Sequence, residues 1–366
     1  MRFPSLLTLE TEQQAVVDLP FHGCHVVTGA PGAGKSAMAV YRAWALATAG
    51  REVTLLARSN LLRQYLAQAA PDLTETLTVT TFHRWVRAFW RARFQTTPPQ
   101  TDEGGWSYDW FEMQRDCVLN QVRSTAHLVI DEGQDLPAGF YDLCRILDIG
   151  VTVFADEEQR IGDDQSTLSE MCRALSVRSD PLVLRENHRN SREISMLASE
   201  FHKNDYGEDH LPAPSGRMPC VLRIPSLGHL LTGIHQYFIA QPERSIGIIC
   251  RSTLLLRDIQ SRLTRHGLAK YTQAYVHDDE YRKDMDFSGK SIRIVSTASM
   301  KGLEFDSVFV PDLDTYTEDP TSVGARLRFF VLCTRAREDL HLMYRGPKEP
   351  AILSSIPESL LARQAG

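Results

Sequence analysis

The sequence lacks the marks of a secreted, membrane-spanning or disulfide-framed protein. Its seven cysteines are odd in number and scattered, and none forms the C-x-x-C pair of a zinc or redox motif. No apolar run approaches the roughly 20 residues that span a bilayer. Polar residues at positions 8 and 10–12 interrupt the N-terminal segment before a signal-peptide core can form. These absences predict reduced thiols, a cytoplasmic location and no membrane partner.

Strong charge of either sign is also missing. The formal net charge is −6 and the isoelectric point is near 6.1, which argues against a protein that coats nucleic acid uniformly but allows a local basic groove. No internal repeat or low-complexity tract interrupts the 366 residues, a length that suits two domains. Evidence of a partner must therefore come from local motifs.

Apolar, β-branched runs alternate with amphipathic stretches, which is typical of parallel sheets with crossover helices. A first series of expected strands lies at residues 25–28, 53–57, 77–81, 128–130 and 151–155. Helices are expected at 37–49 and 60–70. A second series of expected strands lies at 182–184, 245–250, 291–296, 307–310 and 340–343. We therefore expect an α/β protein with two domains, residues 1–180 and 181–366.

The segment after the first expected strand has the pattern G-x-x-x-x-G-K-S of a phosphate-binding loop. It consists of Gly29, Ala30, Pro31, Gly32, Ala33, Gly34, Lys35 and Ser36. Glycines let backbone N–H groups approach the phosphates, while Lys35 reaches the β- and γ-phosphates and the Ser36 hydroxyl ligates magnesium. Because the segment stands between an expected strand and an expected helix, it predicts a site for ATP and Mg²⁺.

Two carboxylates, Asp131 and Glu132, follow the expected strand at 128–130. This strand-end position holds magnesium in phosphate-loop NTPases. We assign Asp131 to the metal, and Glu132 to orienting and deprotonating the attacking water. The alternative is a pair of carboxylates at a helix N-terminus, a common device on protein surfaces.

Several further segments make the chain resemble the UvrD/Rep-type superfamily 1 (1A) helicases, in the family's order. Residues 11–16 (T-E-Q-Q-A-V) are similar to the glutamine motif that reads adenine, with Gln13 favoured and Gln14 as the alternative. Residues 80–83 (T-T-F-H) are similar to the T-F-H segment on the nucleic-acid path, and residues 131–135 match D-E-x-Q-D. Residues 154–161 are similar to G-D-x-x-Q-x-I, which implies that Gln159 senses the γ-phosphate.

The second half continues this resemblance. Residues 184–189 (L-R-E-N-H-R) resemble L-x-x-N-Y-R, which implies that Arg189 contacts the γ-phosphate. Residues 301–305 match K-G-L-E-F, which implies that Gly302 and Glu304 bind the nucleotide. Residues 331–337 are similar to V-A-x-T-R-A-R, with Arg335 as a second arginine finger. The family implies two RecA-like parallel-sheet domains with an ATP cleft between them, in which arginines of one domain couple hydrolysis to domain closure.

The chain also departs from the family. Ala298 stands where a histidine is frequent, His188 replaces a tyrosine and Ala155 replaces a glycine. The first insertion is short, at about residues 84–125. The stretch between residues 189 and 301 is too short for the large extra subdomain of full-length relatives, which is therefore absent or vestigial. The resemblance is therefore to a compact motor core.

Residues 84–94 interleave four arginines with four aromatic residues, the chemistry of single-strand channels, in which cations follow phosphates and rings stack on bases. The candidate contacts to nucleic acid are Thr81, Phe82, His83, Arg84 and Arg87. Alternatively, Trp85, Phe89 and Ala92 lie at helical spacing and pack on the core while the arginines are solvated. The same alternatives apply to Trp106, Trp110 and Phe111, for which we favour the core.

Together these features predict an ATP hydrolase. The first hypothesis is a translocase or helicase that moves 3′ to 5′ on single-stranded DNA or on DNA with a single-stranded tail. The alternative is a regulatory ATPase that senses DNA and licenses a partner nuclease or effector, in repair or antiviral defence, without processive unwinding. The short insertions favour this alternative over a processive helicase. A nucleotide kinase is disfavoured because the D-E-x-Q-D and T-R-A-R segments have no role in one.

Overall fold

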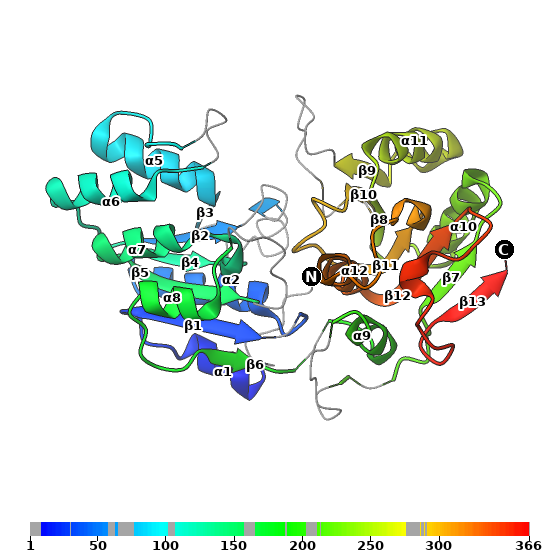
Figure 1. The fold of residues 1–366 in the computed structure, drawn as a ribbon, viewed down its shortest axis with the longest axis horizontal. Helices are drawn as coiled ribbons and strands as arrows, with labels where there is room; N and C mark the ends of the chain where they lie inside the picture. Colours follow the sequence, from blue (N-terminus) through cyan, green and yellow to red (C-terminus); the bar gives the residue numbers. More distant parts are fainter. Residues whose placement is uncertain are drawn as a thin grey trace. The chain divides into compact units, whose positions relative to one another are not determined.

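The computed structural model describes most of the chain, which divides into two compact units. The described residues are 9–29, 31–57, 63–64, 77–101, 107–156, 165–186, 189–202, 211–212, 214–275, 286, 289 and 291–365. One unit ends at Arg185 and the other begins at Glu186. Helices and strands are interleaved along each unit (Figure 1). Each unit is built on a parallel sheet, which confirms the expected α/β class with two RecA-like domains.

The first unit contains a six-stranded sheet in the order β3-β2-β4-β5-β1-β6. Its strands are β1 (Cys24–Gly29), β2 (Val53–Ala57), β3 (Thr78–Thr81), β4 (His127–Ile130), β5 (Gly150–Ala155) and β6 (Leu182–Leu184). Its helices are α1 (Thr11–Val17), α2 (Lys35–Thr48), α5 (Phe82–Phe94), α6 (Trp110–Leu119), α7 (Ala138–Ile146) and α8 (Leu168–Ala174). The first five expected strands are thereby confirmed, and so is the helix expected at 37–49. The helix expected at 60–70 lies largely outside the described residues.

The alternation of side chains along each strand assigns helices to the two faces of this sheet. On one face, Val151 and Val153 of β5 belong to a core that also contains Trp90 of α5 and Phe140 of α7. Thr152 points to the other face, where α2 lies. Burying an aromatic side chain such as Phe140 contributes about 2–3 kcal/mol to folding. The sheet therefore has a well-packed helix layer on each face, and its strand ends remain available for ligands.

Strand β6 belongs to the first sheet and not to the second unit in which the sequence places it. Its Leu184 is in register with Gly29 of β1. A Cβ atom on Gly29 would overlap with the carbonyl oxygen of Leu184, so the close approach of the two strands requires glycine. Arg185 follows β6, and its backbone N–H and guanidinium donate to the carboxylate of Glu12 in α1, at 2.6 and 3.0 Å. The first unit thus extends through Arg185.

A buried polar cluster lies at the opposite, amino-terminal ends of the strands. The His127 ring is 2.9 Å from the Thr152 hydroxyl, and the Arg42 guanidinium donates to that hydroxyl at 3.5 Å and to the carbonyl oxygen of Leu19 at 2.6 Å. Within the described residues, His127 Nδ1 is buried without a hydrogen-bond partner. Burial, followed by the positive charge of Arg42, lowers the pKa of His127 to about 3. The ring is therefore neutral in the folded protein.

We expect this histidine to weaken folding of the first unit as the pH falls. Below an ordinary pKa of 6.5 the unfolded chain protonates His127 whereas the folded chain does not, so stability is lost as the pH drops from about 6.5 towards 3. Between pH 7 and 5 this loss is about 2 kcal/mol. Urea titrations followed by tryptophan fluorescence measure it, because all five tryptophans lie in this unit.

His127→Gln is expected to reduce the pH dependence of the free energy of unfolding by about 2 kcal/mol between pH 7 and 5. The control is His22→Gln, a change at an exposed histidine of the same unit, which should behave as wild type. Equal pH dependence in the wild type and His127→Gln would contradict the neutral buried ring.

The second unit contains a seven-stranded sheet in the order β13-β7-β12-β11-β8-β10-β9. Its strands are β7 (Cys220–Arg223), β8 (Ile246–Cys250), β9 (Thr272–Tyr275), β10 (Ile292–Ser296), β11 (Phe305–Val310), β12 (Ala336–Tyr344) and β13 (Ala362–Ala365). Its helices are α9 (Arg192–Ser199), α10 (Leu227–Ala240), α11 (Thr253–Leu263) and α12 (Val323–Cys333). The expected strands at 245–250, 291–296, 307–310 and 340–343 are confirmed, whereas β7, β9 and β13 were not expected.

Helices α10 and α11 share a core with one face of the second sheet, and α9 and α12 pack together beside β12. Gly247 of β8 has no room for a side chain, because a Cβ there would overlap with the Phe305 ring. Across the described ranges of both units, no helix has the length and apolar character needed to cross a bilayer.

Candidate nucleotide site

The carboxyl ends of three neighbouring strands carry the residues that the sequence assigns to ATP. The phosphate loop follows β1, Asp131 and Glu132 follow β4, and Asp156 follows β5. In open parallel sheets this edge is where ligands bind. Residues from distant parts of the sequence therefore meet at one place in the first unit.

The phosphate loop has the backbone that its glycines permit. Gly32 and Gly34 have φ angles of 92° and 86°, and Gly34 is the N-cap of α2. The Lys35 ammonium donates to the carbonyl oxygen of Gly29 and lies 3.0 Å from the carboxylate of Asp156. Pro31 and Ala33 are buried, while Ala30 lies outside the described residues. Backbone N–H groups in the first turn of a helix have no acceptor within that helix, so the start of α2, together with Lys35, is suitable for an anion.

The structure distinguishes the two glutamines of α1. Gln13 is buried, and its Nε2 lies 3.2 Å from the position that a Cβ of Gly34 would occupy. Gln14 is exposed and donates to Asp18 at 3.3 Å. Gln13, the glutamine favoured above for reading adenine, is therefore the one that lies next to the phosphate loop.

Asp131 has the properties expected of a magnesium ligand. Its side chain is 3% exposed, and within the described part of the chain its Oδ2 has no hydrogen-bond partner. Burial, then the neighbouring charge of Glu132, raises its pKa to about 7, while a hydrogen bond from the Ser36 hydroxyl and the charge of Lys35 oppose this shift. A carboxylate and a hydroxyl are oxygen donors of the kind that Mg²⁺ prefers. These residues therefore fit the cation.

Few protein ligands are needed at such a site. No cluster of three or more metal-binding side chains occurs in the described ranges. Magnesium that accompanies a nucleotide takes most of its ligands from phosphates and water, with one or two from the protein. Asp131 and Ser36 are enough for that role.

Glu132 is held by a short chain of hydrogen bonds. It adopts a left-handed backbone conformation with φ 59° and is 8% exposed. Gln134 Nε2 donates to Glu132 Oε2 at 2.6 Å, and the backbone N–H of Asp156 donates to Gln134 Oε1 at 2.9 Å. Since Asp156 also pairs with Lys35, this series of hydrogen bonds connects the Glu132 carboxylate to the phosphate loop.

Sequence reasoning counted Gln134 among the motif residues of the site without giving it a contact, and it assigned no role to Asp156. Both lie in segments that carry the family resemblance, and this position was the sequence feature that could have indicated a role in the site. Gln159, which the resemblance assigns to the γ-phosphate, lies outside the described residues. Glu132 is therefore connected to the loop through Gln134 and Asp156 in the part of the site that the structure describes.

The candidate arginines belong to the second unit and are engaged there. Arg189 Nη2 lies 2.7 Å from Glu304 Oε1. Burial would raise the pKa of Glu304, but the charge of Arg189 holds it below its ordinary value. Gly302 has a φ of 80° in the same loop. Arg335 is 1% exposed, and its guanidinium donates to the carbonyl oxygens of residues 331 and 303 and to the hydroxyl of residue 334.

The candidate nucleic-acid contacts lie at the junction of β3 and α5. Thr81 is the N-cap of α5, and Phe82 is buried. The His83 ring lies 3.2 Å from the Tyr108 hydroxyl, and burial, followed by the charge of Arg87, lowers the pKa of His83. Arg84 and Arg87 are exposed. The junction therefore presents two cations beside a neutral imidazole.

The aromatic residues divide between core and surface. The rings of Trp85 and Phe89 stack at 5.2 Å and pack on the core, as one alternative states. Trp110 packs on the same core, as favoured, and Trp106 lies outside the described residues. The preference for the core is wrong for Phe111, which is 78% exposed.

The helical period explains that difference. Trp110, Met113 and Cys117 form the inward face of α6, so Phe111 points the other way. Ala92 of α5 is likewise exposed, because Val86 and Trp90 form the buried face of that helix.

Comparison with known proteins agrees with the site in the first unit. Residues 12–165 match the family model of an AAA domain, so the loop and both carboxylates fall within one region similar to AAA domains. The solved structures that match include the C-terminal domain of a possible DNA helicase from Lactobacillus plantarum, at 18% identity and a TM-score of 0.37, with 48% of this chain and 97% of that chain covered. This likeness is too low to support a statement about function. No curated protein gave a significant match.

Proposed function

We propose that the chain is an ATP-hydrolysing motor that moves along single-stranded DNA. One observation carries the ATPase part of the proposal. Lys35, after β1, and the buried carboxylates of Asp131 and Glu132, after β4, lie at the same edge of the sheet, in a region similar to AAA domains. The DNA part rests on the order of the helicase-like segments and on the T-F-H segment at the end of β3.

Each nucleotide-site residue of the first unit has a distinct role in this proposal. Lys35 exchanges part of its contact with Asp156 for the β- and γ-phosphates, and Gln13 reads the adenine. Ser36 and Asp131 would hold the magnesium that accompanies the triphosphate, and that ion would supply neutralising charge to the phosphates. Glu132, which Gln134 holds in place, orients the attacking water and accepts its proton.

The second unit supplies the arginines in this proposal. When the units close on ATP, Arg189 exchanges Glu304 for the γ-phosphate, and Arg335 gives up backbone acceptors to reach it. Positive charge delivered to the transition state accelerates phosphoryl transfer by about 10³–10⁵ in systems that use an arginine finger. Hydrolysis is thereby coupled to closure of the two units, and closure to movement along the strand.

The test is ATP hydrolysis by the full chain with and without single-stranded DNA, together with strand displacement on duplexes that carry a 3′ or a 5′ tail. We expect DNA to stimulate hydrolysis several-fold and displacement to require the 3′ tail. The same assay with RNA distinguishes the two nucleic acids. If no nucleic acid stimulates hydrolysis, the proposed function is wrong. Stimulation without displacement would retain the DNA-dependent ATPase and exclude unwinding by the chain alone.

A further inference from the structure

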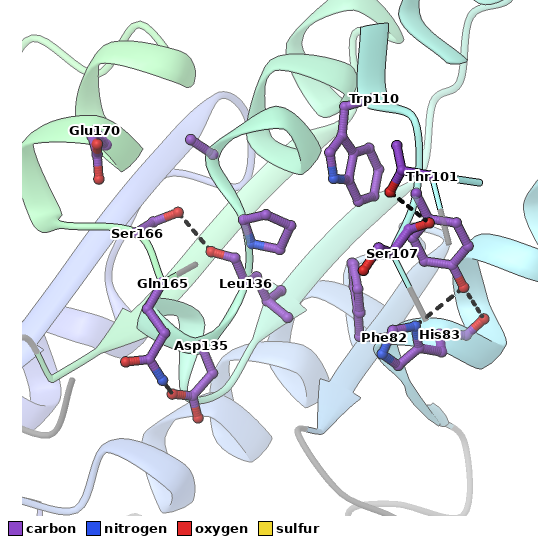
Figure 2. Close-up of a pocket in the computed structure, with 13 residues that line it drawn as sticks. Phe82, His83, Thr101, Ser107, Trp110, Asp135, Leu136, Gln165, Ser166 and Glu170 are labelled. Carbon is purple, nitrogen blue, oxygen red and sulfur yellow. Dashed lines mark hydrogen bonds between the residues drawn. The ribbon is translucent and has the colours of Figure 1, made fainter. Parts of the chain in front are cut away.

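The first unit contains a cavity of about 690 Å³ next to the nucleotide residues. Four segments line it: the start of α5, the residues around the antiparallel bridge between Gln100 and Tyr108, the turn after Gln134, and the residues that lead into α8. Figure 2 shows aromatic side chains on one side of this cavity and polar side chains on the other. The bridge belongs to the short insertion at about residues 84–125, so the insertion forms part of the cavity lining.

The aromatic wall consists of rings that pack against one another edge to face or tilted. The Trp110 ring lies 5.4 Å from the Tyr108 ring and 6.1 Å from the Phe82 ring, measured between centroids. Backbone hydrogen bonds of 3.0 Å hold this segment in place, from Thr101 to Ser107 and from Asp109 to the carbonyl oxygen of residue 99. Rings that are fixed by one another present faces on which a planar ligand stacks at low entropic cost.

The opposite wall is rich in hydrogen-bond acceptors. It contains the carboxylates of Asp135 and Glu170 and the side-chain amide of Gln165, which donates to Asp135 at 2.5 Å. A carboxylate offers about four lone-pair positions, so it accepts further hydrogen bonds beside those already made. The negative charge of this wall disfavours phosphate inside the cavity and favours a group that carries N–H donors.

Cationic groups lie beside the aromatic wall. Burial raises the pKa of Tyr108, and a hydrogen bond from Arg87 opposes this shift, so the two side chains are in contact. Arg84 is exposed one turn earlier on the same helix, on the same side as Arg87. Phosphates are therefore attracted to the surface next to the cavity, and the acceptor wall faces whatever enters it.

We propose that this cavity holds one base of the single strand and prefers a base with an amino group. The base stacks on Trp110, its amino group donates to Gln165 and Asp135, and its phosphates lie on Arg84 and Arg87. Cytosine, adenine and guanine carry such a group, whereas thymine does not. The inference rests on the proposed function, because it assumes that the chain binds single-stranded DNA.

The test compares binding of the full chain to fluorescein-labelled oligonucleotides of 16 deoxycytidines, deoxythymidines or deoxyuridines. Fluorescence anisotropy at pH 7.5, without ATP, gives each Kd. We expect the cytidine strand to bind about tenfold more tightly than the other two, because a cytosine amino group donates two hydrogen bonds to this wall whereas thymine and uracil have a single donor, their ring N3–H. Deoxyuridine shows that the methyl group of thymine is not the cause.

Three variants test the contributions of the two walls to binding separately. Trp110→Ala is expected to weaken binding of every strand, and Trp110→Phe to restore it, since a ring is retained. Gln165→Leu is expected to weaken the cytidine strand alone, towards the Kd of the thymidine strand. Phe111→Ala is the matched control, because this exposed ring on the same helix does not line the cavity.

The outcomes distinguish the inference from the proposed function. If no strand binds the wild type, the proposed function fails. If all three strands bind equally and Trp110→Ala behaves like Phe111→Ala, the chain binds DNA but the base site is wrong. An undiminished cytidine preference in Gln165→Leu would overturn the assignment of Gln165 as an acceptor for the base.

Discussion

Replacing Lys35 with alanine is expected to abolish ATP binding by the full chain. The Lys35 side chain is only 10% exposed and lies at the start of α2 beside the loop, so its ammonium group meets the phosphates in a largely dry environment. Loss of two charge-assisted hydrogen bonds costs about 3–6 kcal/mol, which raises the Kd by more than about 100-fold. Titration with a fluorescent ATP analogue measures this change.

The ion pair with Asp156 requires a second variant. Removing Lys35 leaves a buried carboxylate without this cation, and such a change destabilises a protein by several kcal/mol. The double variant Lys35→Ala/Asp156→Asn removes that charge as well, and it should fold like wild type yet still not bind ATP. Lys270→Ala, at an exposed lysine of the second unit, is the control. Binding close to the wild-type Kd in the double variant would contradict the assignment of Lys35.

Replacing Glu132 with glutamine is expected to retain ATP binding and slow hydrolysis by about 10²–10⁴-fold. Glutamine has the size of glutamate and can present its carbonyl oxygen to Gln134, so the hydrogen-bond chain to Asp156 is preserved. It cannot accept the proton of the attacking water. Single-turnover hydrolysis measures the chemical step, and the ATP analogue titration shows that binding is intact.

The control for Glu132→Gln is Glu112→Gln, which makes the same chemical change at a surface ion pair with Arg115. That pair contributes little to stability, so hydrolysis should be unchanged. If Glu132→Gln hydrolysed ATP at a rate near that of wild type, another group would have to be the base.

Local sequence predicts most strands of both sheets because each is a short apolar, β-branched run. It does not predict which sheet a strand joins. The strand at 182–184 reads the same in either unit, and its place beside β1 depends on the missing side chain of Gly29, far away in the sequence. The strands at 272–275 and 362–365 were missed because polar residues interrupt their apolar pattern.

The sequence predicts the site residues that belong to recognisable motifs, and it predicts no others. The loop and the strand-end carboxylates are local patterns with a known chemical use. The hydrogen bonds from Glu132 through Gln134 to Asp156 connect the ends of two strands that are distant in the sequence, so no single segment predicts them. The aromatic wall of the cavity depends on the bridge between Gln100 and Tyr108, a pairing that the irregular segment around it does not indicate.

Helix α1 gives the first unit a mechanical linkage. One of its residues, Gln13, touches the phosphate loop at Gly34, and the residue before it, Glu12, holds Arg185, where the chain leaves the unit. The helix has only seven residues, so its two contacts lie within two turns of each other. Helix α1 therefore connects the phosphate loop to the residue at which the chain leaves the unit by a route separate from the pairing of β1 with β6.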